Sequence, residues 1–129
     1  MPNVSLVATL AATVLGFLLG GLWYGPLFGS RWAALAGVSS ETRRSPAAVY
    51  AATFVLGFIA AYVFGLYIGP NPGRAFAIAC GAAAGLCWVA TAVATNYLFE
   101  GRPPALIVIN AGYHAVRFTL IGVAFAFLG

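Results

Sequence analysis

Residues 105–128 read ALIVINAGYHAVRFTLIGVAFAFL, a run that is long enough to cross a bilayer and yet contains strongly polar side chains. Asn110, Tyr113, His114 and Arg117 are spaced i, i+3, i+4 and i+7, so a helix places all four on one face. Such groups must face protein or water, because lipid tails offer them no hydrogen bonds. The sequence therefore predicts a membrane helix with an internal polar stripe, and an ionisable group in that stripe indicates a functional site.

The composition of the whole chain agrees with a membrane protein. Its 129 residues are 63% hydrophobic and only 6% charged, whereas about a quarter of the residues of soluble proteins are charged. This excludes a soluble fold and predicts one transmembrane domain over residues 1–129. The net charge of +4 comes from six arginines, of which only Arg43 and Arg44 are adjacent, so no basic surface for nucleic acid is expected.

Residues suited to catalysis are scarce. One histidine, two glutamates and no aspartate leave no catalytic triad, no carboxylate dyad and no set of metal ligands. We therefore expect a protein that is not an enzyme and that holds neither a metal nor another cofactor.

Four apolar runs reach the length of a membrane span: 4–24, 47–68, 75–99 and 105–128. They predict an all-α integral membrane four-helix bundle with both termini on one side. The Leu-Phe-x-x-Arg frame at 27–31, after span one, recurs at 98–102, after span three, which suggests a weak parallel repeat of two helical hairpins.

The arginines predict the orientation of these spans. The connectors after spans one and three contain four of them, Arg31, Arg43, Arg44 and Arg102, whereas the opposite side has Arg74. Because positive loops stay in the cytoplasm, we expect both termini on the periplasmic or extracellular side of the membrane.

The first connector begins with a helix-breaking pair, Gly25-Pro26, directly after two aromatic residues typical of a membrane interface, Trp23 and Tyr24. We expect span one to end there. The chain should then continue as a short interfacial segment that Trp32 helps to anchor.

Other polar and small residues indicate how the spans associate. Thr91, Thr95 and Asn96 on span three are further candidates for the polar intramembrane site, and each threonine hydroxyl can bond either its own backbone or a neighbouring helix. Glu100 and Arg102 should form an exposed ion pair that fixes the third turn. Glycines four residues apart predict close helix packing, at the pairs Gly16/Gly20, Gly21/Gly25, Gly65/Gly69 and Gly81/Gly85 and along Gly57-Ala61-Gly65.

Three motifs together resemble a known family. They are Trp23-Tyr24-Gly25-Pro26-Leu27-Phe28-Gly29-x-x-Trp32, Asn96-Tyr97-Leu98-Phe99-Glu100-Gly101-Arg102-Pro103 and Ile109-Asn110-Ala111-Gly112-Tyr113-His114. In this order and spacing the chain resembles the DUF1761 family of bacterial membrane proteins. The resemblance implies a four-span inner-membrane protein and no particular activity, because the function of the family is unknown. Arg117 departs from the family pattern, in which an uncharged residue is usual.

Two functions remain open from the sequence. In the first, the stripe lines a path or pocket for a small anionic or polar solute, within a homo-oligomer, because four spans are narrow for a pore. In the second, the stripe only bonds helices together and the protein is a scaffold or partner subunit in the lipid bilayer. Under either reading we expect Arg117, close to the bilayer centre, to stay charged and to be held by groups other than a carboxylate.

Overall fold

The computed structural model describes residues 4–37 and 45–129, and these residues form helices and no strand. The first part contains α1 (Leu6–Leu22), η1 (Trp23–Leu27) and α2 (Gly29–Ala36). The second contains α3 (Pro46–Ile68), α4 (Arg74–Ala83), η2 (Ala84–Ala90), α5 (Thr91–Glu100) and α6 (Pro104–Leu128), where η1 and η2 are π-helical. The predicted all-α class is confirmed.

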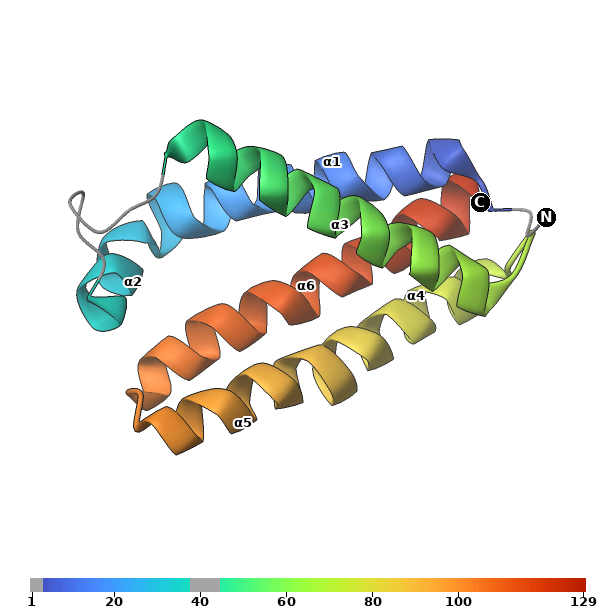
Figure 1. The fold of residues 1–129 in the computed structure, drawn as a ribbon. Helices are drawn as coiled ribbons and strands as arrows, with labels where there is room; N and C mark the ends of the chain where they lie inside the picture. The colour runs from blue at the N-terminus through green and yellow to red at the C-terminus, as the bar shows by residue number, and fades with distance from the viewer. Residues whose placement is uncertain (1–3, 38–44) are drawn as a thin grey trace.

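Four helices are long and apolar enough to cross a membrane, as predicted: Leu6–Leu27, Pro46–Ile68, Arg74–Glu100 and Pro104–Leu128. The first joins α1 to η1, and the third joins α4, η2 and α5 into one rod (Figure 1). Both termini lie at the same end as the turn between α3 and α4, and α2 lies at the opposite end with the turn between α5 and α6 (Figure 1).

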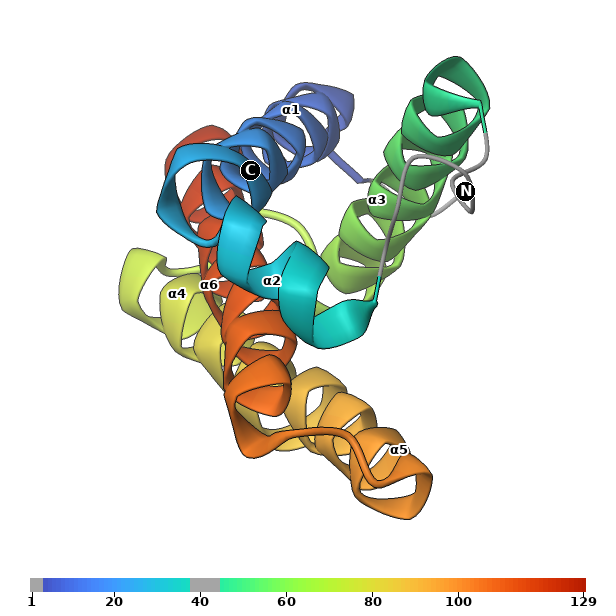
Figure 2. The same cartoon turned by 90° about the vertical axis from the view of Figure 1, so that its left-hand side faces the viewer.

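The helix α6 is the centre of the packing. It lies between α1 on one side and the α4–η2–α5 rod on the other, while α3 packs mainly on α1. No substantial contact joins α3 to α5, and seen from the end the two helices stand apart (Figure 2). The packing order α3–α1–α6–rod is therefore open on one side.

Where the four spans converge, near the termini, they share an apolar core. Its buried members are mostly alanines and phenylalanines: Ala8, Ala12, Ala61, Phe64, Ala77, Ile121, Ala124, Phe125 and Ala126. Small side chains predominate because lipid tails are as apolar as leucine, so close packing rather than the hydrophobic effect must hold the helices.

Glycines bring α4 and η2 into backbone contact with α6. A Cβ atom on Gly81 would lie 2.4 Å from the carbonyl oxygen of Phe118, and one on Gly85 would lie 2.8 Å from that of Ala115. From the other side, a Cβ atom on Gly122 would lie 2.4 Å from the carbonyl oxygen of Ala77. The predicted packing role is thus confirmed for Gly81 and Gly85, whereas Gly21 and Gly25 have no atom within 4 Å of such a Cβ position.

Span one, predicted to end at residue 24 before Gly25-Pro26, extends three residues further. The helix continues to Leu27 by widening into η1, in which the N–H of Phe28 donates to the carbonyl oxygen of Trp23 at 2.9 Å. Such an i→i−5 turn accommodates Pro26, which has no N–H to donate. The chain turns at Phe28 instead, because the glycine at position 29 lets the backbone approach the carbonyl oxygen of Tyr24, 2.5 Å from where a Cβ would be. The short segment predicted beyond this turn is helical and forms α2.

Gly81→Ala tests the backbone contact. The added methyl group has no space beside the carbonyl of Phe118, so we expect the free energy of unfolding in detergent to fall by about 1–3 kcal/mol. Gly21→Ala is the matched control, with open space around it, and it should leave stability unchanged or slightly higher. Equal stability of the two variants in a denaturant titration would contradict the close contact.

Candidate functional site

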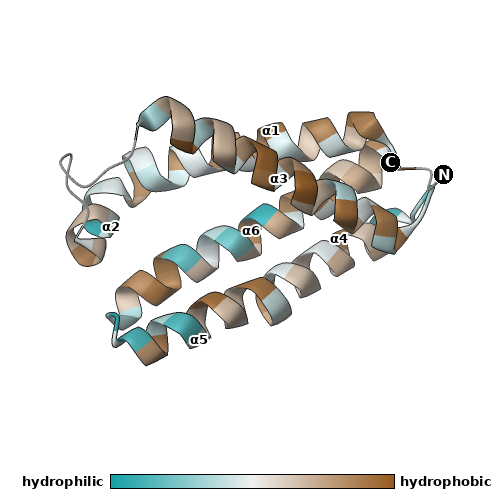
Figure 3. Cartoon of the chain, in the orientation of Figure 1, coloured by the Kyte–Doolittle hydropathy of each residue, from teal (hydrophilic) through white to brown (hydrophobic). Residues whose placement is uncertain are grey.

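The predicted polar stripe lies along the middle of α6. Figure 3 shows hydrophilic residues there and near the end of α5, whereas most of α3 is hydrophobic. Three helices approach the stripe, η1 and α1 from one side and α5 from the other.

Asn110 connects α6 to two of these helices, η1 and α5. Its Oδ1 atom accepts a hydrogen bond from the hydroxyl of Tyr24 in η1 at 2.6 Å, and its Nδ2 atom donates to the hydroxyl of Tyr97 in α5 at 2.9 Å. The side chain is buried, with 8% of the residue exposed. This end of the stripe therefore works as a seam between helices.

Tyr113, one turn further along, bonds to α1. Its hydroxyl donates to the carbonyl oxygen of Gly16 at 3.0 Å, and Gly20 leaves room for it, since a Cβ there would lie 3.2 Å from the hydroxyl. Trp23 also reaches α6, where its Nε1 atom donates to the carbonyl oxygen of Ile109 at 2.9 Å. The polar atoms of Trp23 and Tyr24, predicted to mark a membrane interface, are thus bonded inward to α6.

His114 and Arg117 have fewer partners. The Nη2 atom of Arg117 lies 3.4 Å from Nδ1 of His114, at the long limit of a hydrogen bond. The guanidinium carbon lies 4.6 Å from the ring centroid of Phe118, and the aliphatic stem packs against Gly16. The Nε atom is buried and has no hydrogen-bond partner among the described residues. A buried donor without an acceptor is costly, so this end of the stripe has unused hydrogen-bonding capacity.

The course of α3 explains why the His114–Arg117 end of the stripe is less covered by neighbouring helices. Near the C-terminus of α6, α3 packs closely, with the rings of Phe64 and Phe125 5.8 Å apart and Gly65 against Phe125. Towards its own N-terminus α3 diverges, and residues 46–56 are all exposed. On the helical face His114 lies between Arg117, which contacts α1, and Phe118, which contacts α4. It is half-buried, on the side of α6 where α3 and α5 make no substantial contact with each other.

A family model matches residues 7–126, and its description is a protein of unknown function, DUF1761. The chain belongs to the DUF1761 family. The match covers nearly the whole chain and confirms the resemblance carried by the three sequence motifs. No curated protein and no solved structure matches the chain.

Several residues predicted for the polar site of this DUF1761 protein lie apart from the stripe. The hydroxyl of Thr91 donates to the carbonyl oxygen of Cys87 at 2.8 Å, and that of Thr95 donates to the carbonyl oxygen of Thr91 at 2.7 Å. Both threonines and Asn96 are exposed, so α5 contributes Tyr97 to the stripe in their place. Tyr97 was missed, although it belongs to the motif that begins at Asn96, because an aromatic residue near the end of a span is typical of an interface.

The remaining predicted residues lie at the end that contains α2. The ring of Trp32 makes an edge contact with that of Tyr24, with centroids 5.2 Å apart. Glu100 and Arg102 form an exposed ion pair, with 3.7 Å between Oε1 and Nε. Across residues 4–37 and 45–129, no group of three or more His, Cys, Asp or Glu side chains is placed to hold a metal ion.

Tyr97→Phe tests the seam of the DUF1761 protein at Asn110. It removes one interhelical hydrogen bond, so we expect the free energy of unfolding to fall by about 0.6–2 kcal/mol. Tyr67→Phe is the control, because Tyr67 is 85% exposed. A double-mutant cycle with Tyr24→Phe should give a non-zero coupling energy through Asn110, and strict additivity would argue against the three-residue connection.

Proposed function

We propose that this protein is a non-catalytic membrane protein that binds small anionic solutes at His114 and Arg117. The observation that carries the proposal is the guanidinium of Arg117, whose Nε atom is buried without an acceptor in residues 4–37 and 45–129. Asn110 and Tyr113 hold the neighbouring helices in place around this site.

The depth of Arg117 supports a ligand rather than a protein partner. Thirteen residues separate it from Pro104, or about 20 Å along the helix, which exceeds the reach of an arginine side chain to the headgroups. Glu100 lies at that far end and is paired with Arg102. A charge at this depth costs about 2.5–3.5 kcal/mol on insertion scales, and an anion would offset part of that cost.

The open side between α3 and α5 supports access to the site. A ligand that enters there meets the half-buried His114 first and Arg117 behind it. We propose that a second copy of the chain closes this side, so that a path for small anions forms in a homo-oligomer. A single chain of four spans is too narrow to enclose such a path.

A second candidate function is that of a membrane scaffold or partner subunit. The bonds of Asn110 to both Tyr24 and Tyr97 favour it, because they show that part of the stripe joins helices. In that case the open side would hold another protein instead of a solute.

We further propose that α2 and the turn between α5 and α6 lie in the cytoplasm and both termini outside the bacterial inner membrane. Arg31 and Arg102 lie at the proposed cytoplasmic end, where the sequence adds Arg43 and Arg44, against Arg74 at the other end. An alkaline phosphatase fused after Gly129 should therefore be active in bacterial cells. An inactive fusion, together with an active cytoplasmic reporter at the same position, would reverse the orientation.

Arg117→Leu tests the proposed solute path. Proteoliposomes that contain the purified chain should admit iodide, measured with an enclosed halide-sensitive dye, and the substitution should lower this flux at least tenfold. Removal of an unpaired charge should leave the helices as stable as before or more stable. Arg74→Leu, at the far end of the molecule, is the matched control and should retain the flux.

A labelling experiment separates the two candidate functions. After Cys80 and Cys87 are replaced by alanine, a cysteine at position 114 should react with a water-soluble thiol reagent, whereas one at the buried Ile121 should not. Wild-type flux equal to that of empty liposomes, with no labelling at position 114, would favour the scaffold.

A further inference from the structure

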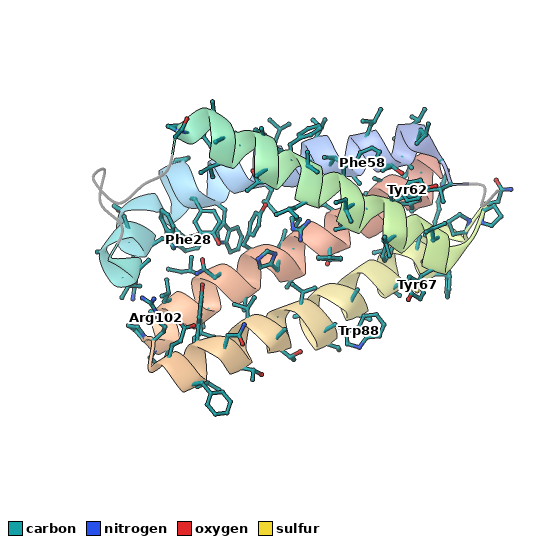
Figure 4. The ribbon with its side chains drawn as sticks, in the orientation of Figure 1. Phe28, Phe58, Tyr62, Tyr67, Trp88 and Arg102 are labelled. Atoms are coloured by element: carbon teal, nitrogen blue, oxygen red, sulfur yellow. The ribbon has the colours of Figure 1, made fainter. Side chains whose placement is uncertain are left out.

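A groove separates α2 from the first turns of α6, at the end of the molecule away from the termini. Its volume is about 270 Å³, and it is lined by Phe28, Arg31, Ala105, Val108 and Ile109. Four of these residues are apolar, and Arg31 is the one charged residue among them. Figure 4 shows Phe28 directed towards α6 and Arg102 at the same end.

Arg31 has unused hydrogen-bonding capacity. Its residue is exposed, and neither an ion pair nor a hydrogen bond occupies its guanidinium within the part of the chain that the structure describes. Arg102, at the same end, forms a long ion pair with Glu100, in which Nε and Oε1 are 3.7 Å apart. An arginine presents five donors in a planar fork that matches a phosphate group.

The direction of the groove matches that of a lipid. Ala105 is the second residue of α6, so it lies at the membrane boundary, and Ile109 lies four residues, or about 6 Å, deeper. The charge is therefore at the rim and the apolar wall lies below it. Val108 and Leu27, which are 70% and 56% exposed, extend this apolar surface outwards.

We propose that this groove binds an anionic phospholipid, with the phosphate on Arg31 and one acyl chain against Phe28, Val108 and Ile109. A free phosphate ion would leave the apolar wall uncovered, and a neutral lipid would have less attraction to the unpaired guanidinium. The groove is separate from the site proposed at Arg117, which lies nine residues beyond Val108 along α6. Each site can therefore be tested alone.

The test uses the purified full chain in a neutral detergent. Native mass spectrometry would count bound palmitoyl-oleoyl phosphatidylglycerol and, in parallel, phosphatidylcholine with the same acyl chains. We expect the wild type to retain phosphatidylglycerol preferentially and Arg31→Gln to reduce that retention roughly fivefold, the factor for about 1 kcal/mol per arginine near an anionic surface.

Two further variants test the two parts of the site. Arg74→Gln removes an arginine at the opposite end, where its guanidinium lies over the ring of Phe127, and it should not change lipid retention. Val108→Trp fills the groove from an exposed position and keeps Arg31, so it should also reduce retention. Millimolar inorganic phosphate should not displace the lipid.

Three results would overturn the proposal: equal retention by the wild type and Arg31→Gln, an equal loss with Arg74→Gln, or full retention with Val108→Trp. The first would show that Arg31 does not hold the headgroup, and the second that only net charge matters. The third would show that the groove holds no acyl chain. Helix content by circular dichroism would confirm that each variant is folded.

Discussion

Lipid tails supply no hydrogen bonds, so each polar side chain within the membrane has to find its partner in the protein. Asn110, Tyr113, His114 and Arg117 are all on α6, and this requirement explains its central position. Asn110 bonds to η1 and to α5, and Tyr113 bonds to α1. The glycines complete the arrangement, because Gly81, Gly85 and Gly122 let the α4–η2 backbone approach that of α6 on the remaining side. Once α6 is held in this way, α3 is left to pack on α1.

The π-helical end of span one serves the same requirement. Gly16, Gly20 and Tyr24 are spaced by four, and all three contact α6 through Arg117, Tyr113 and Asn110 in turn. A normal α-helix would be interrupted near Tyr24, because Pro26 cannot donate to the preceding turn. By widening into η1, the helix continues past the proline and keeps Trp23 and Tyr24 directed at α6. The turn then occurs at Phe28, where Gly29 permits it.

The sequence predicted those features that depend on spacing along one helix. The four spans, the common face of Asn110 and Arg117, and the close packing at Gly81 all follow from local patterns. Features that depend on the rotation of one helix against another were not predictable. Thr91 and Thr95 satisfy their hydroxyls on carbonyls of their own rod, so polarity alone does not reveal which face of α5 meets α6. Tyr97, on that face, looked like an interfacial aromatic residue.

The polar residues of α6 are regularly spaced along one face, but their surroundings differ. The difference arises because α3 crosses α6 instead of running alongside it. Asn110 lies where η1 and α5 both approach, so its two polar atoms are satisfied. Near Phe125, α3 covers the same side of α6 with apolar groups. His114 and Arg117 lie between these regions, beyond the reach of α5 and short of the point where α3 closes on α6. Within the part of the chain that the structure describes, an arginine in that interval meets a glycine, an aromatic ring and an imidazole but no acceptor for its Nε atom. The unused hydrogen-bonding capacity at Arg117 is therefore a consequence of where the helices diverge, and closer coverage by α3 along the whole of α6 would change it.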